Sequence, residues 1–310
     1  MAFDVALYFS GNFSGSVDSQ VDRYLIDSNA HRLLTFAYPK EVDHYLGMAN
    51  ETGHRCRMML DSGAFTAWNS GKEVTLKELV DYNDKVLARY PQHEFLLISL
   101  DVIPGERGRK PTAEELAKGI EESKQNFKVM QEHYKGRARV LPVYHTGEEL
   151  SLRNYYMGLT DYLCLSMDQT MSERDRLSWA KRVAVPGWQY HGLAATGNNM
   201  VTQIRWSSAD SSSWVTVGSM GSILWPVGNR FRVLPISSNS PARHDAGHHY
   251  RTLSEYERHQ VEHFIRSKGF DPEALAVSYQ YRWLWNAYMW LETPWKRNLQ
   301  EPIDLFEGLC

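Results

Sequence analysis

Short apolar runs recur along the chain up to residue 210, and polar segments with the spacing of helices separate them. There are eight such runs, at residues 5–11, 32–38, 57–63, 95–103, 139–145, 161–167, 188–195 and 204–210. Continuous apolar runs of this length are typical of parallel strands that are buried on both faces. Eight of them, alternating with helices, predict an α/β fold and favour a closed (β/α)8 barrel over an open sheet.

The segments between the runs carry helix-start signals. Residues 75–90 place apolar side chains at helical spacing behind a Thr75 cap, and residues 112–134 repeat the pattern after Pro111 and Thr112. No Gly-rich dinucleotide fingerprint or phosphate loop follows any run, which argues against an open nucleotide-binding sheet.

The pattern changes after residue 210. Residues 215–240 are interpreted as short β segments with Gly turns, inserted after the eighth strand. The C-terminal segment, 251–310, is expected to be helical, with one helix over about 252–268 and another that begins at the cap Asp271. The aromatic run at 279–290 is predicted to pack on the barrel as a helix, with a stacking platform for bases as the alternative. We therefore expect a single barrel domain over 1–310 with these two additions.

Composition narrows the possible classes. A formal net charge of −3 excludes binding of nucleic acid by bulk positive charge but leaves room for a local basic surface. No apolar run approaches the ~20 residues of a membrane span, and the N-terminus lacks the basic region of a signal peptide. Cys56, Cys164 and Cys310 are scattered, so we expect no disulfide framework and a reducing, cytoplasmic compartment.

Aspartates stand where several runs end. Asp61 stands near the end of the third run, Asp101 near the end of the fourth and Asp210 at the end of the eighth. In (β/α)8 barrels the C-terminal ends of the strands form the catalytic face, so these carboxylates are expected to converge on one mouth. Two or more carboxylates around one pocket suit chemistry at a sugar anomeric carbon, where one attacks and another handles a proton.

Other polar residues at the run ends have simpler explanations. Asp168 is interpreted as part of a loop that leads into a helix, and His145 and His191 as either site residues or satisfied polar groups beside the core. No metal is expected, because the cysteines lack metal-ligand spacing. A zinc site, with possible ligands His244, His248, His249 and Cys310, is kept as an alternative.

Four segments, in order, resemble the tRNA-guanine transglycosylase superfamily. "LDSGAF" is similar to its Asp-Ser-Gly-Gly-Phe/Tyr motif, "SLDVIPG" to the next strand end, "HGLAAT" to its Gly-Gly-Leu-Ala-x-Gly segment, and "SSADSSSW" to the segment with its nucleophile. The resemblance covers about residues 57–214. The last segment looks most like the branch that inserts 7-deazaguanines into DNA, which is common in phages and genomic islands.

The resemblance implies a role for each matching residue. Asp210 would be the nucleophile, and Asp61 would bind the base and assist proton transfer. Asp101 would accept hydrogen bonds from the guanine edge. The substrate-binding residues would further include Ser62, Gly63, His145, Gly192 and Leu193, although the tRNA enzymes have glutamine where this chain has His145.

Two departures from the tRNA enzymes bear on the polymer. The cysteine-rich zinc site and the basic segment that reads the anticodon loop have no counterpart, which favours DNA as the substrate. The candidate phosphate contacts form two basic groups, Arg107, Arg109 and Lys110 after Asp101, and Arg230, Arg232, Arg243 and Arg251 in and after the insertion. Either group has a solvated loop as its alternative explanation.

The sequence thus predicts a base-exchange glycosyltransferase that replaces guanine in DNA with a 7-deazaguanine similar to preQ0, through a covalent aspartyl intermediate. Its partners would be DNA and the free base, without a cofactor, and it could act with helper proteins or as a homodimer. A glycoside hydrolase that uses two of the same aspartates is one alternative. A non-catalytic barrel that binds a purine or nucleic acid is the other.

Overall fold

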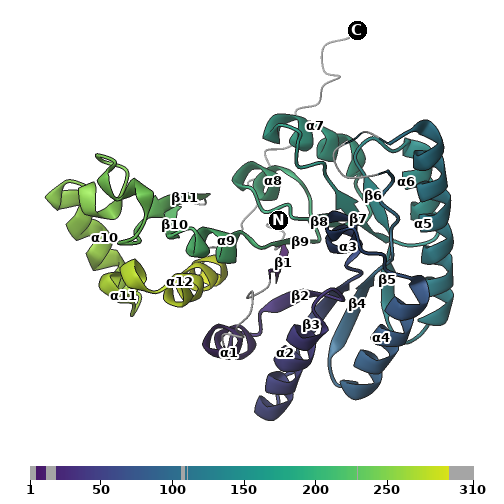
Figure 1. The fold of residues 1–310 in the computed structure, drawn as a ribbon, viewed down its shortest axis with the longest axis horizontal. Coiled ribbons are helices and arrows are strands. Elements are labelled where there is room, and N and C mark those ends of the chain that lie inside the picture. Colours follow the sequence, from purple (N-terminus) through teal and green to yellow (C-terminus); the bar gives the residue numbers. More distant parts are fainter. Residues whose placement is uncertain (1–4, 12–18, 106–108, 110, 229, 293–310) are drawn as a thin grey trace, which may run out of the picture.

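The computed structural model describes residues 5–11, 19–105, 109, 111–228 and 230–292. Parallel strands alternate with helices through the first part of the chain (Figure 1). The barrel strands are β1 (Ala6–Phe9), β2 (His31–Thr35), β3 (Arg57–Asp61), β4 (Glu94–Ile98), β5 (Arg139–Leu141), β6 (Val143–His145), β7 (Tyr162–Ser166), β8 (Gln189–Leu193) and β9 (Ser208–Ser211). Their order in the sheet is β5-β4-β3-β2-β1-β9-β8-β7-β6.

The fifth apolar run holds the two ends of this sheet together. Strands β5 and β6 are its two halves, separated by Pro142, which has no N–H to donate to a ladder. Leu141 at the end of β5 accepts from Ser99 N–H at 2.9 Å, and Pro142 itself accepts from Cys164 N–H at 2.9 Å. One continuous segment therefore borders both β4 and β7, and the sheet is a nearly closed barrel. The predicted α/β barrel is confirmed, with nine strands in place of eight because Pro142 divides one of them.

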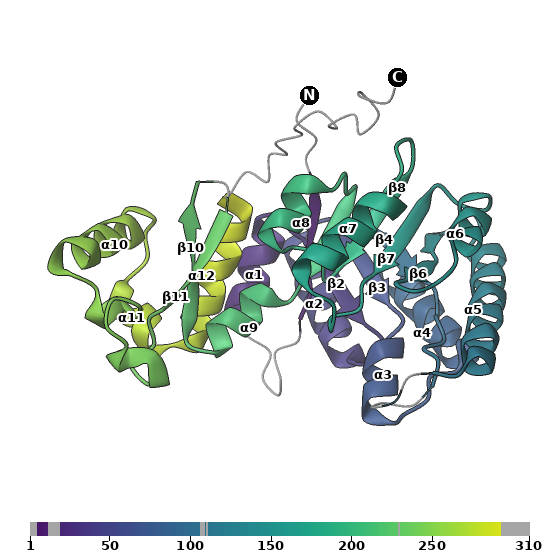
Figure 2. The ribbon, with the colours of Figure 1, turned by 90° about the horizontal axis from the view of Figure 1, so that it is seen from above.

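Helices surround the barrel (Figure 2). They are α1 (Ser19–Asp27), α2 (Pro39–Thr52), α3 (Ala64–Ser70), α4 (Leu76–Arg89), α5 (Ala113–His133), α6 (Leu150–Met157), α7 (Glu173–Val183), α8 (Asn198–Gln203) and α9 (Ser213–Ser219). The predicted caps are confirmed at the two clearest helix starts, since Thr75 and Thr112 each form a capping box with a glutamate.

Alternation along each strand divides the core into two layers. An inner cluster includes Tyr8, Leu33, Met59, Ile98 and Cys164, which fill the barrel. A larger cluster packs the outer face of the strands against the helices. This parity decides which polar side chains can reach the barrel axis.

The chain after β9 forms a second lobe beside the barrel (Figure 1). Strands β10 (Ser222–Val227) and β11 (Arg230–Pro235) pair as an antiparallel hairpin, and α10 (Glu255–Ser267), α11 (Pro272–Val277) and α12 (Tyr279–Glu292) pack near it. Two short 3-10 turns, 241–244 and 250–252, connect them. Residues 215–219 were expected in the β insertion, but they belong to helix α9, where Trp214 and Val215 are buried in the core.

The aromatic run at 279–290 lies within helix α12. Trp283, Trp285 and Trp290 are buried, and the helix packs against α1, α9 and β10. The predicted packing role is therefore confirmed. Asp271 also caps α11 as expected, because its carboxylate accepts from the N–H groups of Glu273 and Ala274. No described helix is both long and apolar enough to cross a membrane.

Candidate active site

Asp61 ends strand β3, and the turn after it fixes the carboxylate. Gly63 N–H donates to Oδ2 of Asp61 at 3.0 Å, and Gly63 has a φ of 75°. A Cβ added to Gly63 would lie 3.1 Å from the backbone nitrogen of Ala37. Glycine is required here for both reasons. Ser62, beside it, is buried and accepts from Ala64 N–H.

The pKa of Asp61 is raised to about 6. Burial is the largest cause; hydrogen bonds from Thr35 and Gly63 oppose it, and the charges of Asp101 and Asp210 add to it. A carboxyl group with this pKa is present in both protonation states near neutral pH, which a group that gives and takes a proton requires.

Asp101, after β4, lies beside His145 at the end of β6. Nε2 of His145 is 3.0 Å from Oδ2 of Asp101, and both side chains are largely buried. The backbone N–H of His145 donates to Glu148 Oε2 at 2.6 Å. Burial lowers the pKa of His145, but the contacts with Asp101 and the charge of Glu148 outweigh it and leave the pKa raised. The predicted guanine-edge residue thus lies against an imidazole whose protonated form it stabilises.

Asp210 lies inside β9 with its carboxylate turned into the barrel. It is 6% exposed, and Oδ1 accepts from Ala194 N–H at 3.0 Å. Nε2 of His191 lies 3.2 Å from the same oxygen. Both contacts use Oδ1, so among the described residues Oδ2 is left for bond formation. Ala194 has a φ of 50°, an uncommon value for a residue with a Cβ, and this conformation aims its N–H at Asp210.

A buried chain of polar groups leads from the barrel interior to Asp210. Tyr162 hydroxyl contacts Ser208 Oγ, and Ser208 Oγ lies 2.6 Å from Nδ1 of His191, which is 0% exposed. Burial raises the pKa of Tyr162 to about 12, so its hydroxyl stays protonated. One direction of donation satisfies every member: Tyr162 to Ser208, Ser208 to His191, and His191 Nε2–H to Asp210. His191 therefore positions the carboxylate and is too deep to touch a substrate.

The three strand-end aspartates act on a common region. Burial raises the pKa of the Cys164 thiol, and the charges of Asp210, Asp61 and Asp101 raise it further. Cys164 belongs to the inner cluster, so the carboxylates lie around the axis above one buried thiol. The structure thus brings together Asp61, Asp101 and Asp210 at one end of the barrel.

Gly192 and Leu193, two of the expected base contacts, face opposite sides of strand β8. Gly192 lies within β8 and faces the outer layer, where an added Cβ would lie 2.6 Å from Ala195 Cβ and 3.1 Å from the Trp206 ring. The absence of a side chain at Gly192 thus allows Ala195 and Trp206 to pack against the strand. Leu193 is half-buried beside the inner cluster. Trp206 and Trp214 stand four residues before and after Asp210 in the sequence. Both are fully buried in the outer layer and donate to backbone carbonyls there, so they support the strands from behind.

A cavity of about 380 Å³ is lined by residues of α7, α8 and the start of β11, and we call it the α7–α8 cavity. Its wall includes Ala194 and Ala195, whose N–H groups contact the Asp210 carboxylate and carbonyl. Arg176 from α7 and Arg230 from the hairpin also line it. Sequence reasoning identified Arg230 but missed Arg176, Ser208 and Tyr162. Ser208 could have been found from the alternation of side chains along a strand, because it stands two residues before Asp210 and therefore lies on the same face.

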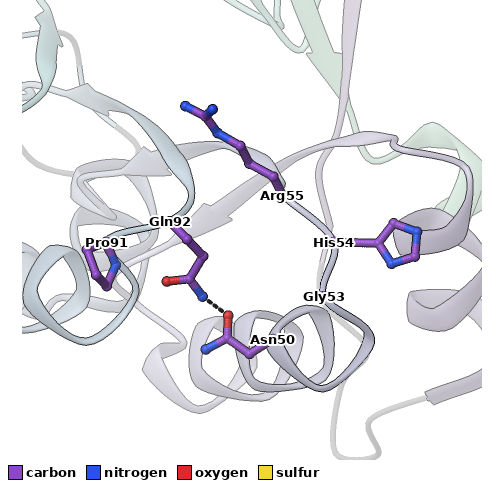
Figure 3. Close-up of a pocket in the computed structure, with 6 residues that line it drawn as sticks. All are labelled: Asn50, Gly53, His54, Arg55, Pro91 and Gln92. Atoms are coloured by element: carbon purple, nitrogen blue, oxygen red, sulfur yellow. Dashed lines mark hydrogen bonds between the residues drawn. The ribbon is translucent and has the colours of Figure 1, made fainter.

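A second hollow of about 500 Å³ lies between the C-terminal ends of α2 and α4, where β3 and β4 begin. Gln92 and Asn50 point toward each other there, and His54 and Arg55 point away from them (Figure 3). Because it borders the N-terminal ends of the strands, it is separate from the aspartates.

The predicted basic contacts differ in what surrounds them. Arg109 forms a two-pronged ion pair with Glu115, so a phosphate would compete with that carboxylate. Arg107 and Lys110 lie outside the described residues. Arg230 and Arg232 are exposed on β11, and the remaining two predicted basic residues, Arg243 and Arg251, are also exposed.

The alternative zinc ligands do not gather among the described residues, in which no group of three or more His, Cys, Asp or Glu side chains could hold a metal. Both ring nitrogens of His249 contact the backbone, Nε2 at Ser237 O and Nδ1 at Arg251 N–H. His244 takes a hydrogen bond from Arg243, and Cys310 lies outside the described residues. Asp168 is part of a turn, as predicted, and accepts from Thr170.

Comparison with known proteins leaves this site to be interpreted from its own geometry. No protein-family model and no curated protein matches the chain. Among solved structures, the crystal structure of SacUVDE is similar at a TM-score of 0.31 and 8% sequence identity, over 67% of this chain and 92% of that chain. A TM-score of this size carries no argument about fold or function.

Proposed function

We propose that this chain is a base-exchange glycosyltransferase that replaces guanine in DNA with a 7-deazaguanine base. One observation carries the proposal: two carboxylates at the same mouth have different environments. Asp210 is held by an N–H and an imidazole on one oxygen, whereas the pKa of Asp61 is raised to about 6. Neighbouring carboxyl groups with different environments divide into nucleophile and acid–base partner. The order of the four resembling segments supports the same assignment.

The first displacement uses Asp210 as the nucleophile. Oδ2 attacks C1′ of the target nucleotide, the C1′–N9 bond breaks, and a glycosyl ester forms. The departing guanine takes a proton from Asp61 in its acid form. Asp101 accepts hydrogen bonds from the N1–H and 2-amino groups, so adenine, which lacks them, would leave these hydrogen bonds to a buried carboxylate unmade.

The second displacement reverses the first with another base. The incoming base gives its N9 proton to Asp61, and N9 attacks C1′. The ester bond to Asp210 breaks and restores the free carboxylate. In a duplex the target nucleotide would first have to leave the stack, because the aspartates lie inside the barrel mouth.

Incubation of the protein with DNA and labelled guanine tests this function. We expect label to enter the polymer with wild type and with Asp168→Asn, an exposed aspartate on the same rim, and not with Asp210→Asn. Release of base without uptake of label would favour hydrolysis. Binding of DNA or purine that never leads to exchange in wild type would favour the non-catalytic alternative.

A further inference from the structure

The α7–α8 cavity has no task in the two displacements, although Ala194, which contacts Asp210, lines it. Its floor is apolar, since Met167 and Met200 are 4% and 3% exposed. Its wall at Ala194 provides the N–H that holds Asp210. The cavity wall is therefore one residue away from the Asp210 carboxylate.

Positive charge faces the cavity from two elements. Arg176 of α7 donates through Nη1 to Gln169 at 2.8 Å, while its Nε is buried and meets no acceptor among the described residues. Arg230 begins β11 and is exposed at the cavity.

The hairpin is fixed at the cavity by two hydrogen bonds. The Asn198 side chain donates to Phe231 O at 2.9 Å and accepts from Phe231 N–H at 3.0 Å. Asn198 belongs to α8, so this paired contact holds the start of β11 against the helix that borders the cavity. Arg230, next to Phe231, is placed there by rigid elements.

One carboxylate also lines the cavity and limits the charge of its ligand. Glu173 Oε1 accepts from Asn199 Nδ2 at 3.1 Å. Two guanidinium groups and one carboxylate leave one positive charge in surplus. That surplus matches the single negative charge of a phosphodiester better than the double charge of a terminal phosphate.

We propose that the α7–α8 cavity binds the phosphodiester and part of the nucleotide next to the target in a DNA strand, with Arg176 and Arg230 on the phosphate. The assignment of the strand rests on the proposed function, because it places C1′ of the target at Asp210. Binding at this subsite determines how the strand lies across the mouth, while the free base is held by Asp61 and Asp101.

Binding of a fluorescent single-stranded DNA oligonucleotide, measured by anisotropy over a salt series without free base, tests the subsite. Arg176→Gln and Arg230→Gln should each weaken binding by about 10-fold or more, since a hydrogen bond to a charged group is worth ~1.5–3 kcal/mol. Each should also lower the salt slope by about one unit or less. Arg174→Gln is the matched control, because Arg174 is exposed on α7 and does not line the cavity. It should bind like wild type.

A neutral methylphosphonate at the phosphate next to the target sharpens the test. Wild type should lose affinity for this oligonucleotide, and Arg176→Gln should lose little more, because both changes remove the same contact. Because Arg230 is exposed, Arg230→Gln should not disturb the fold. It therefore still tests the subsite if Arg176→Gln disturbs helix α7.

The subsite and the proposed function can fail separately. If base exchange occurs but both cavity variants match Arg174→Gln in affinity and salt slope, the subsite is wrong. If wild type exchanges no base but the cavity variants still weaken DNA binding, the two arginines bind a DNA phosphate as proposed, while the proposed function and the position of a target sugar at Asp210 fail. Tighter binding of RNA than of DNA through the same two arginines would overturn the assignment to DNA.

Discussion

Replacement of Asp61 by Asn should make the protein more stable near neutral pH while it abolishes base exchange. The raised pKa of Asp61 means that its ionised form is disfavoured in the folded state. Asn has the same size and can still accept from Gly63 N–H, so the turn after β3 should persist. It has no proton to exchange at neutral pH, so it cannot serve the departing or incoming base.

The magnitude follows from the two pKa values. The pKa of Asp61 is about 6 when folded, against an ordinary value of 3.8. The folded state therefore binds more protons between these values, and stability falls as pH rises through the window. A difference of about two pH units at ~1.4 kcal/mol each sets an upper limit of about 3 kcal/mol. The loss of stability caused by the ionised Asp61 carboxylate is absent below pH 3.8 and complete above about pH 6.

Urea unfolding of wild type and Asp61→Asn at pH 4 and pH 8 measures the effect. The variant should gain up to about 3 kcal/mol over wild type at pH 8 and much less at pH 4. Asp168→Asn serves as the control, because the Asp168 carboxylate is exposed on the same rim. Its stability difference from wild type should change little between the two pH values. An Asp61→Asn variant that is less stable than wild type at pH 8 would refute the buried-carboxyl reasoning.

Two further predictions concern strand β8. His191→Gln keeps an N–H near the Nε2 position and should retain more exchange than His191→Asn, whose shorter side chain reaches only toward Ser208. The Asn variant should lose about 10- to 100-fold in kcat with little change in KM. Equal rates in the two variants would remove the positioning role of His191. Gly192→Ala should cost about 1–3 kcal/mol in urea unfolding, because its Cβ would overlap Ala195 and press on Trp206, and an unchanged midpoint would contradict this packing.

Features that depend on local sequence were predictable. Apolar runs marked the strands, Thr75 and Thr112 marked helix starts, and the ends of the runs identified Asp61 and Asp210 as residues of the barrel mouth. Each of these features follows from a pattern within a few residues. The alternation of side chains along a strand then gives the face of the sheet on which each residue lies.

Features that depend on pairing between distant segments were not predictable. Pro142 reads as part of one apolar run, and only the ladders on either side show that it divides the strand. Trp206 stands only four residues before Asp210 in the sequence, but it packs in the outer layer against Gly192. The pairing of His191 with Asp210 joins neighbouring strands, and the position of Arg176 at the cavity depends on how α7 meets α8.

The central claim is that Asp210 forms a covalent bond to the sugar, and trapping that bond tests it most directly. Wild type, DNA and a deazaguanine base are incubated and denatured, and any protein–DNA adduct is digested and located by mass spectrometry. We expect the adduct on the peptide that contains Asp210, and its loss in Asp210→Asn, which keeps the size of the side chain and removes its charge. Normal base exchange by Asp210→Asn, or an adduct on Asp61, would contradict the account.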